Sequence, residues 1–199
     1  PVIVEAVRTP IGKARGALSG LHPAHLLGAS QKEVIRRAGI DATLVEQVVG
    51  GCVTQAGAQG NNVTRGAWLA SDLPWQTACT TIDCQCSSAQ QANHFIANLI
   101  HAGAMDVGIA CGVESMSRVP MGSDGGAWAM DPRTALETDF VPQGISADLI
   151  ATLEGSSRAD LDAEKPETFA SGCRRRFAGA GKLRTLSAGP ESDSLKGDA

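Results

Sequence analysis

The chain has 199 residues and a formal net charge of −4 at pH 7, with 43% hydrophobic and 19% charged residues. These values are typical of a water-soluble globular protein with one substantial domain, and they give no broad electrostatic basis for binding nucleic acid. No apolar run approaches the length of a membrane span, and the first residues lack the pattern of a signal peptide. Six cysteines are too few for a disulfide scaffold in a chain of this length, so we expect a reducing, cytoplasmic setting.

Strand and helix signals alternate along the first part of the chain. Strands are predicted over residues 2–6, 47–53, 78–82 and 106–110. Helices are predicted over 24–38, shortly after Asp41, over 63–70, and from just behind Cys86 to Gly103. Because strands that alternate with helices are joined by crossover connections, this order predicts an α/β fold with a mainly parallel sheet and helices on both faces.

The pattern changes after Pro120. Residues 121–144 are rich in Gly and Pro and are predicted to be loop-like, residues 145–153 are apolar enough for a helix, and 157–160 could start another. From Lys165 onward large apolar residues become few, which predicts weak order. The chain is therefore expected to comprise an α/β domain over 1–120, a second part over 121–163 and a poorly ordered tail over 164–199.

Cys86 holds the most informative position in the sequence. It follows the predicted strand at 78–82 and opens the next helix, where unpaired backbone N–H groups and the positive end of the helix dipole gather. Such surroundings favour the thiolate, the reactive form of a cysteine, and the N–H groups could stabilise an oxyanion in acyl transfer. A nucleophile and a core-filling cysteine are both compatible with this pattern.

A metal site is the competing interpretation, and the spacing argues against it. Cys84 and Cys86 are separated by one residue, which is tighter than the usual zinc spacing, and no second Cys/His pair accompanies them. We therefore predict no metal. The four histidines are expected to be exposed or helix-capping residues: His22, His25, His94 and His101.

Two further groups of polar residues follow predicted strands. Glu114 lies in the turn 112–117, which should share the carboxyl edge of a parallel sheet with Cys86. It could act as a general acid or base, or it could orient a loop by accepting backbone hydrogen bonds, and we favour the second role. Arg8, Lys13 and Arg15 could bind an anion or form a solvated basic loop, and the sequence leaves both open.

Four stretches, in this order, resemble the N-terminal half of the thiolases (acetyl-CoA acetyltransferases and 3-ketoacyl-CoA thiolases). They are Val2-Ile3-Val4-Glu5-Ala6-Val7-Arg8-Thr9-Pro10-Ile11-Gly12, Gly60-Asn61-Asn62-Val63-Thr64-Arg65, Cys86-Ser87-Ser88-Ala89-Gln90-Gln91-Ala92 and Cys111-Gly112-Val113-Glu114-Ser115-Met116-Ser117. Residues 141–148 resemble part of the family's loop domain. The segment Asp83-Cys84-Gln85-Cys86 most resembles the corresponding segment of actinobacterial thiolases of lipid and steroid side-chain degradation.

The resemblance implies a function. Cys86 would take an acyl group from a 3-ketoacyl-CoA and release acetyl-CoA, and a second CoA would then collect the acyl group; condensation is the reverse. The backbone N–H of Cys86 would form part of an oxyanion hole. Coenzyme A would be a substrate, with no bound cofactor. The resemblance also implies a homo-oligomer, with the loop 62–65 near the dimer contact.

The main departures from the family pattern are motifs that the sequence does not contain. Ala89 and Cys111 replace glycines of the motifs, which are mild changes. The family's Gly-His-Pro histidine, its Cys-x-Gly acid/base and its Asn-Glu-Ala-Phe element do not occur in the sequence, and Pro166 interrupts the helix expected after Ala163. We therefore expect a thiolase part whose second half comes from a partner chain, or a truncated or frameshifted remnant that binds CoA or a partner at most.

Overall fold

The computed structural model describes residues 1–163, and the predicted tail over 164–199 lies outside the described residues. The described chain falls into two compact units, of which the first is Pro1–Asp124 and the second begins at Gly125. Among residues 1–163, no helix combines the length and the apolar character that crossing a membrane requires.

The first unit is built on a parallel sheet of three strands. These are β1 (Gln47–Gly51), β2 (Ala78–Ile82) and β3 (Gly108–Gly112), in the spatial order β2-β1-β3. Both pairings with β1 are parallel, so Gln47 lies between Ala78 and Gly108. The predicted α/β fold with a mainly parallel sheet is confirmed, although β1 ends two residues early and β3 lies two residues later than expected.

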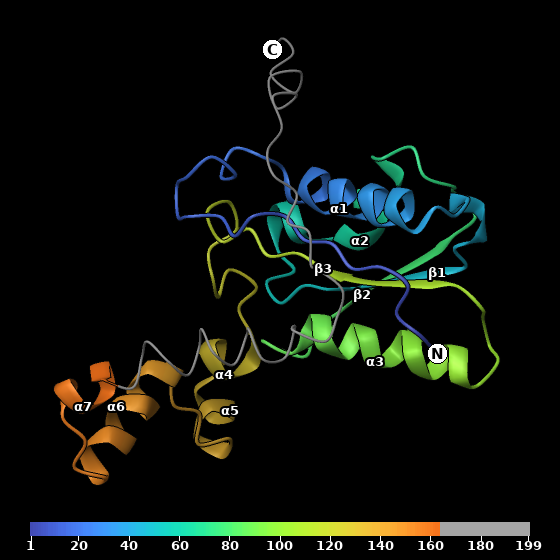
Figure 1. The fold of residues 1–199 in the computed structure, drawn as a ribbon. Helices are drawn as coiled ribbons and strands as arrows, with labels where there is room; N and C mark the ends of the chain where they lie inside the picture. The colour runs from blue at the N-terminus through green and yellow to red at the C-terminus, as the bar shows by residue number, and fades with distance from the viewer. Residues whose placement is uncertain (164–199) are drawn as a thin grey trace. The chain divides into compact units, whose positions relative to one another are not determined.

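Helices cover both faces of this sheet (Figure 1). Helices α1 (Pro23–Ala38) and α2 (Val63–Leu69) pack on one face and α3 (Ser88–His101) on the other, with two short 3-10 helices, η1 (Ala42–Leu44) and η2 (Gly57–Gln59), in the connections. One apolar cluster contains Val48 and Trp68, and the other contains Val49 and Ile96. Because Val48 and Val49 are neighbours on β1, they point to opposite faces, and both faces of the central strand are buried.

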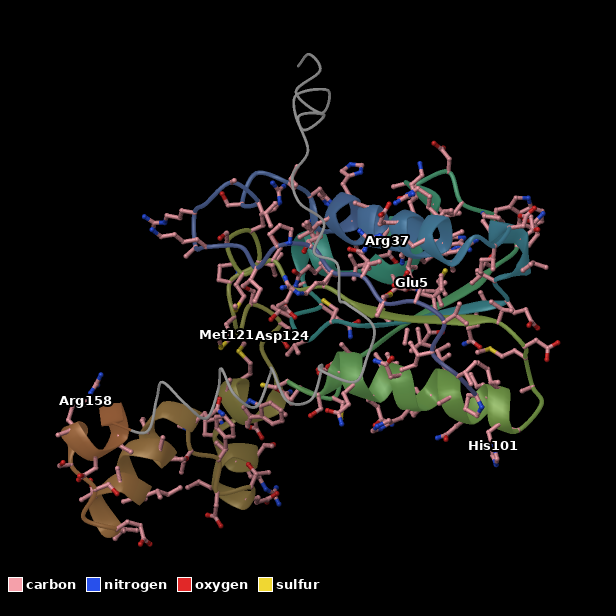
Figure 2. All side chains as sticks on the ribbon, in the orientation of Figure 1. Glu5, Arg37, His101, Met121, Asp124 and Arg158 are labelled. Carbon is pink, nitrogen blue, oxygen red and sulfur yellow. The ribbon has the colours of Figure 1, made fainter. Side chains whose placement is uncertain are left out.

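The predicted helix ends are confirmed by their caps. His22 accepts a hydrogen bond at Nδ1 from the Ala24 N–H at 3.2 Å, and Pro23 occupies the first helical position of α1. The Asp41 side chain accepts a hydrogen bond from the Thr43 N–H at 2.8 Å and so caps η1. His101, at the end of α3, is exposed and points away from the sheet, as expected for a solvated helix histidine (Figure 2).

The predicted strand over residues 2–6 is wrong. Within the part of the chain that the structure describes, this segment pairs with no strand, and Val2, Ile3 and Val4 are 85%, 86% and 74% exposed. β-branched residues favour an extended backbone, but a strand also needs an edge to pair with. The composition of residues 2–6 does favour an extended backbone, but the sequence does not show whether a neighbouring strand is available for pairing.

The second unit consists of short helices: α4 (Ala127–Met130), α5 (Pro132–Glu137), α6 (Gln143–Leu153) and α7 (Arg158–Ala163). The expectation of a loop over 121–144 is wrong in part, because α4 and α5 lie there. Asp131 caps α5 by accepting a hydrogen bond from the Thr134 N–H at 2.9 Å, and this Asp-Pro helix start was missed. The predicted helices over 145–153 and from 157 are confirmed.

Candidate functional site at the carboxyl edge of the sheet

Cys86 lies in the turn between β2, which ends at Ile82, and α3, which begins at Ser88, and its side chain is exposed. The predicted strand-to-helix junction is therefore confirmed. Gln85 adopts a left-handed conformation (φ 50°), which turns the chain sharply just before the cysteine. The resulting turn presents the Cys86 thiol at the carboxyl edge of the sheet, where α/β proteins commonly bind ligands.

Local hydrogen bonds hold this turn in place. The Ser88 hydroxyl accepts from the Cys84 N–H at 2.8 Å and donates to the Gln85 carbonyl at 2.6 Å. Asp83 accepts from the Gln85 N–H at 2.7 Å. Among the described residues, no hydrogen-bond acceptor faces the backbone N–H of Cys86. That N–H group remains available for a ligand at the start of α3, where helices leave their first donors unpaired.

Two glycines allow the start of α3 to approach the sheet closely. A Cβ at Gly51, the last residue of β1, would lie 2.5 Å from the Ser88 carbonyl carbon, and one at Gly112, the last residue of β3, would lie 2.9 Å from the Ala89 Cβ. Side chains at these two positions would push the Cys86 turn outward. The glycines of the strand ends therefore set where the thiol lies.

Glu114 ties together the loops that follow β1 and β3. Its carboxylate accepts a hydrogen bond from the Val53 N–H at 2.9 Å and one from the Gln59 side-chain amide at 2.7 Å. Gln59 also donates to the Thr54 carbonyl at 2.9 Å and accepts from the Ser115 N–H at 2.5 Å. These contacts support loop orientation, the role that we favoured for Glu114.

Gln59 was missed by sequence reasoning. It is fully buried and makes three hydrogen bonds, yet it stands in a Gly/Asn-rich stretch that carries no pattern of a core residue. Buried polar side chains of this kind are found only once the loops that they connect are in place.

The cysteines differ sharply in their surroundings. Burial raises the pKa of the Cys52 thiol to about 12, and the nearby carboxylates of Glu114 and Asp83 act in the same direction. Burial likewise raises the pKa of Cys111 to about 12. Cys84 and Cys86 are the exposed thiols of the described chain. The buried thiols stay neutral and unreactive, which leaves the exposed pair as the candidates for chemistry.

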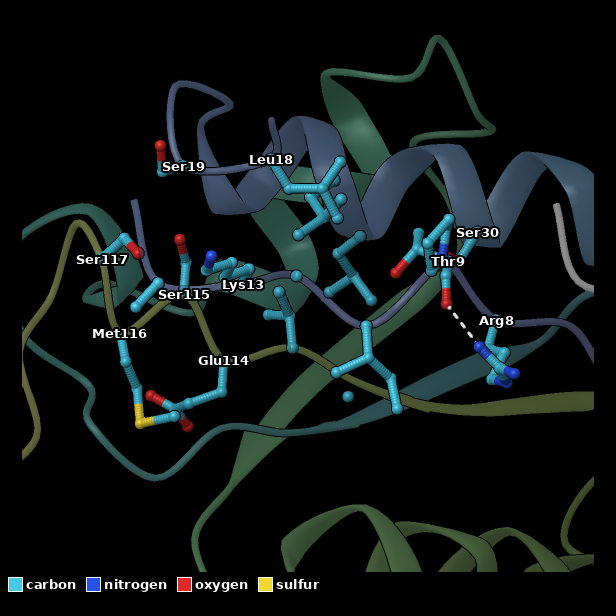
Figure 3. A pocket seen from close by; sticks show the side chains of 18 of the residues that line it. Arg8, Thr9, Lys13, Leu18, Ser19, Ser30, Glu114, Ser115, Met116 and Ser117 are labelled. Atoms are coloured by element: carbon cyan, nitrogen blue, oxygen red, sulfur yellow. Dashed lines mark hydrogen bonds between the residues drawn. The ribbon is translucent and has the colours of Figure 1, made fainter. Parts of the chain in front are cut away.

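A separate cavity of about 690 Å³ lies between the loop 8–18, α1 and the turn 112–117 (Figure 3). Arg8, Lys13 and Arg15 all line it. Arg8 donates to the neighbouring Thr9 carbonyl at 3.1 Å, and the Arg15 N–H donates to the Ser117 hydroxyl at 3.2 Å. Cys86 is not among the lining residues, so the basic loop and the thiol do not share this cavity.

The segment that contains Asn62 and Arg65 fastens α2 to β2. Asn62 caps α2 by accepting from the Arg65 N–H at 3.2 Å, and it donates to the Cys79 carbonyl at 3.0 Å. The Arg65 guanidinium donates to the carbonyls of Thr77 at 2.6 Å and Trp75 at 2.7 Å. Within the first unit these residues therefore have a structural role. The described residues also hold no group of three or more side chains placed to bind a metal.

Comparisons with known proteins agree with this architecture. Residues 1–164 match the family model described as the N-terminal domain of thiolase. A steroid 3-ketoacyl-CoA thiolase of Mycobacterium tuberculosis is 41% identical over 121 residues, which are 61% of this chain and 30% of that protein. A 3-ketoacyl-CoA thiolase of Bacillus subtilis is 35% identical over 167 residues, which are 81% of this chain and 42% of that protein.

The crystal structure of the Bacillus anthracis acetyl-CoA acetyltransferase is similar at a TM-score of 0.56 and 38% sequence identity, covering 60% of this chain and 30% of that chain. The chain thus spans less than half of the length of each of these three relatives. The family match covers most of the 199 residues. The α/β unit is accordingly that of a thiolase N-terminal domain, and the chain belongs to the thiolase family of acyltransferases.

Proposed function

We propose that Cys86 carries the acyl group in thiolytic cleavage of a 3-ketoacyl-CoA, or in the reverse condensation. The observation that carries the proposal is an exposed thiol in the turn before α3, beside its own unpaired backbone N–H. A thiol placed there can attack a thioester-activated substrate from solvent, and the adjacent N–H can receive the oxygen on which negative charge develops.

The proposed reaction has two acyl transfers. The Cys86 thiolate attacks the 3-keto carbon, and collapse of the tetrahedral intermediate breaks the bond between C2 and C3. The electron pair of that bond leaves on C2, which takes up a proton and departs as acetyl-CoA. The thiolate of a second CoA then attacks the acyl-Cys86 thioester, so that a shortened acyl-CoA leaves and Cys86 is regenerated. No oxidant or reductant is required, and CoA enters as a substrate.

Two proton transfers in this scheme need further groups, and among residues 1–163 no hydrogen bond joins the Cys86 thiol to a titratable side chain. One group must accept the thiol proton, and another must protonate the departing carbon. Glu114 is engaged with Val53 and Gln59, and His94 and His101 lie exposed along α3. We propose that both groups come from thiolase polypeptide that lies beyond the matched region. The alternative is a domain that binds CoA or a partner without catalysis.

Acyl transfer to the thiol tests the proposal most directly. The chain is incubated with acetoacetyl-CoA, with and without the coexpressed C-terminal part of the Bacillus subtilis relative, and the acylated cysteine is located by peptide mass spectrometry. Cys86→Ser should abolish the label and CoA-dependent thiolysis. Cys84→Ser is the matched control, because Cys84 is the other exposed thiol of the same turn. An acyl group on Cys84, or thiolysis that survives Cys86→Ser, would contradict the proposal.

We also propose that the chain acts as a homo-oligomer in a reducing cytoplasm. The outer edge of β2 has no strand partner within the described residues, and an oligomer could use that edge. Light scattering of the purified chain gives the mass of the assembly. A monomer at all concentrations would refute the oligomer.

A further inference from the structure

The cavity between the loop 8–18, α1 and the turn 112–117 is separate from the thiol (Figure 3). Two hydrogen bonds join the chain ahead of α1 to the chain around the turn. The Arg15 N–H donates to the Ser117 hydroxyl at 3.2 Å, and the Arg118 guanidinium donates to the Gly20 carbonyl at 3.2 Å. We call this space the basic cavity. Its lining residues all belong to the first unit.

The lining of the basic cavity carries an excess of positive charge. Arg8, Lys13 and Arg15 supply three cations against the one carboxylate of Glu114. Within the described part of the chain, none of these three cations forms an ion pair. The Glu114 carboxylate is instead engaged by hydrogen bonds from the loop that follows β1. Because the whole chain has a net charge of −4, the local excess of cations does not follow from the general composition.

Hydroxyl groups from three separate parts of the chain also line the basic cavity. Thr9 belongs to the loop, Ser30 to α1 and Ser115 to the turn after β3. Among residues 1–163, none of these three hydroxyls makes a hydrogen bond. Ser115 is only 8% exposed, and a polar group so placed is normally paired with a ligand or with water. The cavity therefore presents hydrogen-bond donors from all of its walls.

The loop holds two of its cations in a tight turn. The Gly16 N–H donates to the Lys13 carbonyl at 2.9 Å, and Arg15 between them has a φ of 55°. This left-handed conformation is unfavourable for a residue with a side chain, and backbone strain of this kind is concentrated at ligand sites. The turn brings Lys13 and Arg15 to the same cavity although like charges repel each other.

We propose that the basic cavity binds a small molecule through a phosphate group, either inorganic phosphate or a phosphate monoester. Ammonium, guanidinium and hydroxyl donors on several sides suit a phosphate dianion, which offers at least three acceptor oxygens in different directions. A carboxylate has two oxygens in one plane and would leave the donors of one wall unpaired. The volume of about 690 Å³ lies within the usual range for a small-molecule site.

The inference goes beyond the proposed function, because the cavity does not include Cys86 and no acyl transfer is involved. The phosphate group has two possible sources. One is a free phosphate compound, and the other is CoA, which carries a phosphate monoester on its ribose. The experiment below separates the two sources.

Isothermal titration calorimetry of the full chain with inorganic phosphate measures binding. Sodium chloride keeps the ionic strength constant, so that screening is the same in every titration. Saturable binding is expected, and the amide NMR signals of Ser30 and Ser115 should shift along the same curve. Acetate should bind at least ~tenfold more weakly, since it forms fewer charge-assisted hydrogen bonds.

Competition then identifies the source of the phosphate group. CoA and dephospho-CoA, which lacks the monoester, are each added to the chain with phosphate bound. Displacement by CoA alone would assign the site to the CoA monoester, and displacement by neither would assign it to a free phosphate compound. Equal displacement by both would contradict recognition of a monoester.

Variants of two lysines locate the binding site. Lys13→Gln removes one cation of the cavity and should weaken phosphate binding at least ~tenfold, the loss expected for one charge-assisted hydrogen bond. Lys13→Arg keeps the charge and should restore most of the affinity. Lys32→Gln is the matched control, because Lys32 is exposed on α1 and does not line the basic cavity. Circular dichroism establishes that all three variants are folded.

Three further outcomes would overturn the inference. The first is that phosphate shows no saturable binding, which would make the three cations a solvated basic loop. The second is that acetate binds as tightly as phosphate. The third is equal weakening by Lys13→Gln and Lys32→Gln, which would indicate general attraction of anions to the surface. Each of these results would leave acyl transfer to Cys86 untouched, and a chain that binds phosphate but accepts no acyl group would count against the proposed function alone.

Discussion

At the scale of single residues, the cysteines are sorted by burial rather than by their place in the sequence. Cys52 stands one residue beyond β1, and Cys111 lies within β3, and both are held neutral by desolvation. Cys86 lies four residues beyond β2, in the polar turn that the left-handed Gln85 creates, and its side chain is exposed. The backbone conformation of one residue therefore separates the candidate nucleophile from the structural thiols.

The buried thiols predict a loss of stability at alkaline pH. Their pKa of about 12 in the folded chain lies above the ordinary 9.0 that they regain on unfolding. The folded state therefore holds these protons more tightly, and the stabilisation is complete below pH 9 and is lost as the pH rises from 9 toward 12. Urea unfolding at a series of pH values should show this decline.

A double variant isolates the contribution of these thiols. Cys52→Ala combined with Cys111→Ala should flatten the decline above pH 9, even if its stability at pH 7 is lower. Cys84→Ala removes an exposed thiol and should leave the slope unchanged. The chain contains no tyrosine, so the phenol that usually titrates in this range is absent. If stability fell as steeply with pH in the double variant as in the original chain, the alkaline decline could not be assigned to Cys52 and Cys111.

The sequence predicts the parts of the site whose pattern lies within one short stretch of the chain. Cys86 was found because a strand, a turn and a helix follow one another in sequence around it. Gln59 and Gly51 were not found, because their roles depend on contacts with Ser115 and Ser88 that are distant in the chain. Hydrogen bonds and close approaches between separate loops leave no periodic trace in the sequence.

At the scale of elements, the ends of the helices can be tested with a pair of glycines. Gly39 follows α1 with φ at 68°, and its N–H donates to the Ile35 carbonyl at 3.1 Å. Gly66 lies inside α2, and neither glycine has an atom within 4 Å of where a Cβ would stand. An added Cβ would therefore meet no neighbouring atom at either site, and the two glycines differ only in backbone conformation.

The same substitution should therefore have opposite effects at the two sites. Gly39→Ala should destabilise the chain by about 1 kcal/mol, because an L-residue is strained in the left-handed region. Gly66→Ala should stabilise it by about 0.5–1 kcal/mol, because alanine favours a helix interior. Chemical denaturation of both variants measures the two changes. Destabilisation of equal size at both sites would show that the capping argument is wrong.

The success and failure of the element predictions have one physical reason. Strands β1, β2 and β3 were recognised because each stands next in sequence to a helix that packs on the sheet: α2 follows β1, and α3 lies between β2 and β3. Residues 2–6 are likewise rich in β-branched residues, but they pair with no strand among the described residues, and propensity alone does not form a strand. The helix α5 was missed because Gly and Pro dominate its surroundings, although Asp131 and Pro132 form an ordinary helix start.

At the scale of the whole molecule, the two units differ in how much they bury. The first contains two apolar clusters, with Trp68 fully buried between α2 and the sheet. In the second unit no residue over 125–161 is buried. The rings of Trp128 and Phe140 stack there, with their centroids 5.3 Å apart. A unit with few buried contacts opens at lower free energy than one with a packed core.

The two units should therefore unfold in separate steps. The three tryptophans report on them individually: Trp68 and Trp75 lie in the first unit, and Trp128, 40% exposed, lies in the second. With 5-fluorotryptophan incorporated, fluorine NMR follows each side chain through a urea titration without altering the core. Trp128 should reach its unfolded resonance at lower urea than Trp68, and Trp75 should follow Trp68. Because two-state unfolding requires all probes to coincide, a single shared midpoint would show that residues 125–163 draw their stability from the same cooperative unit as the sheet.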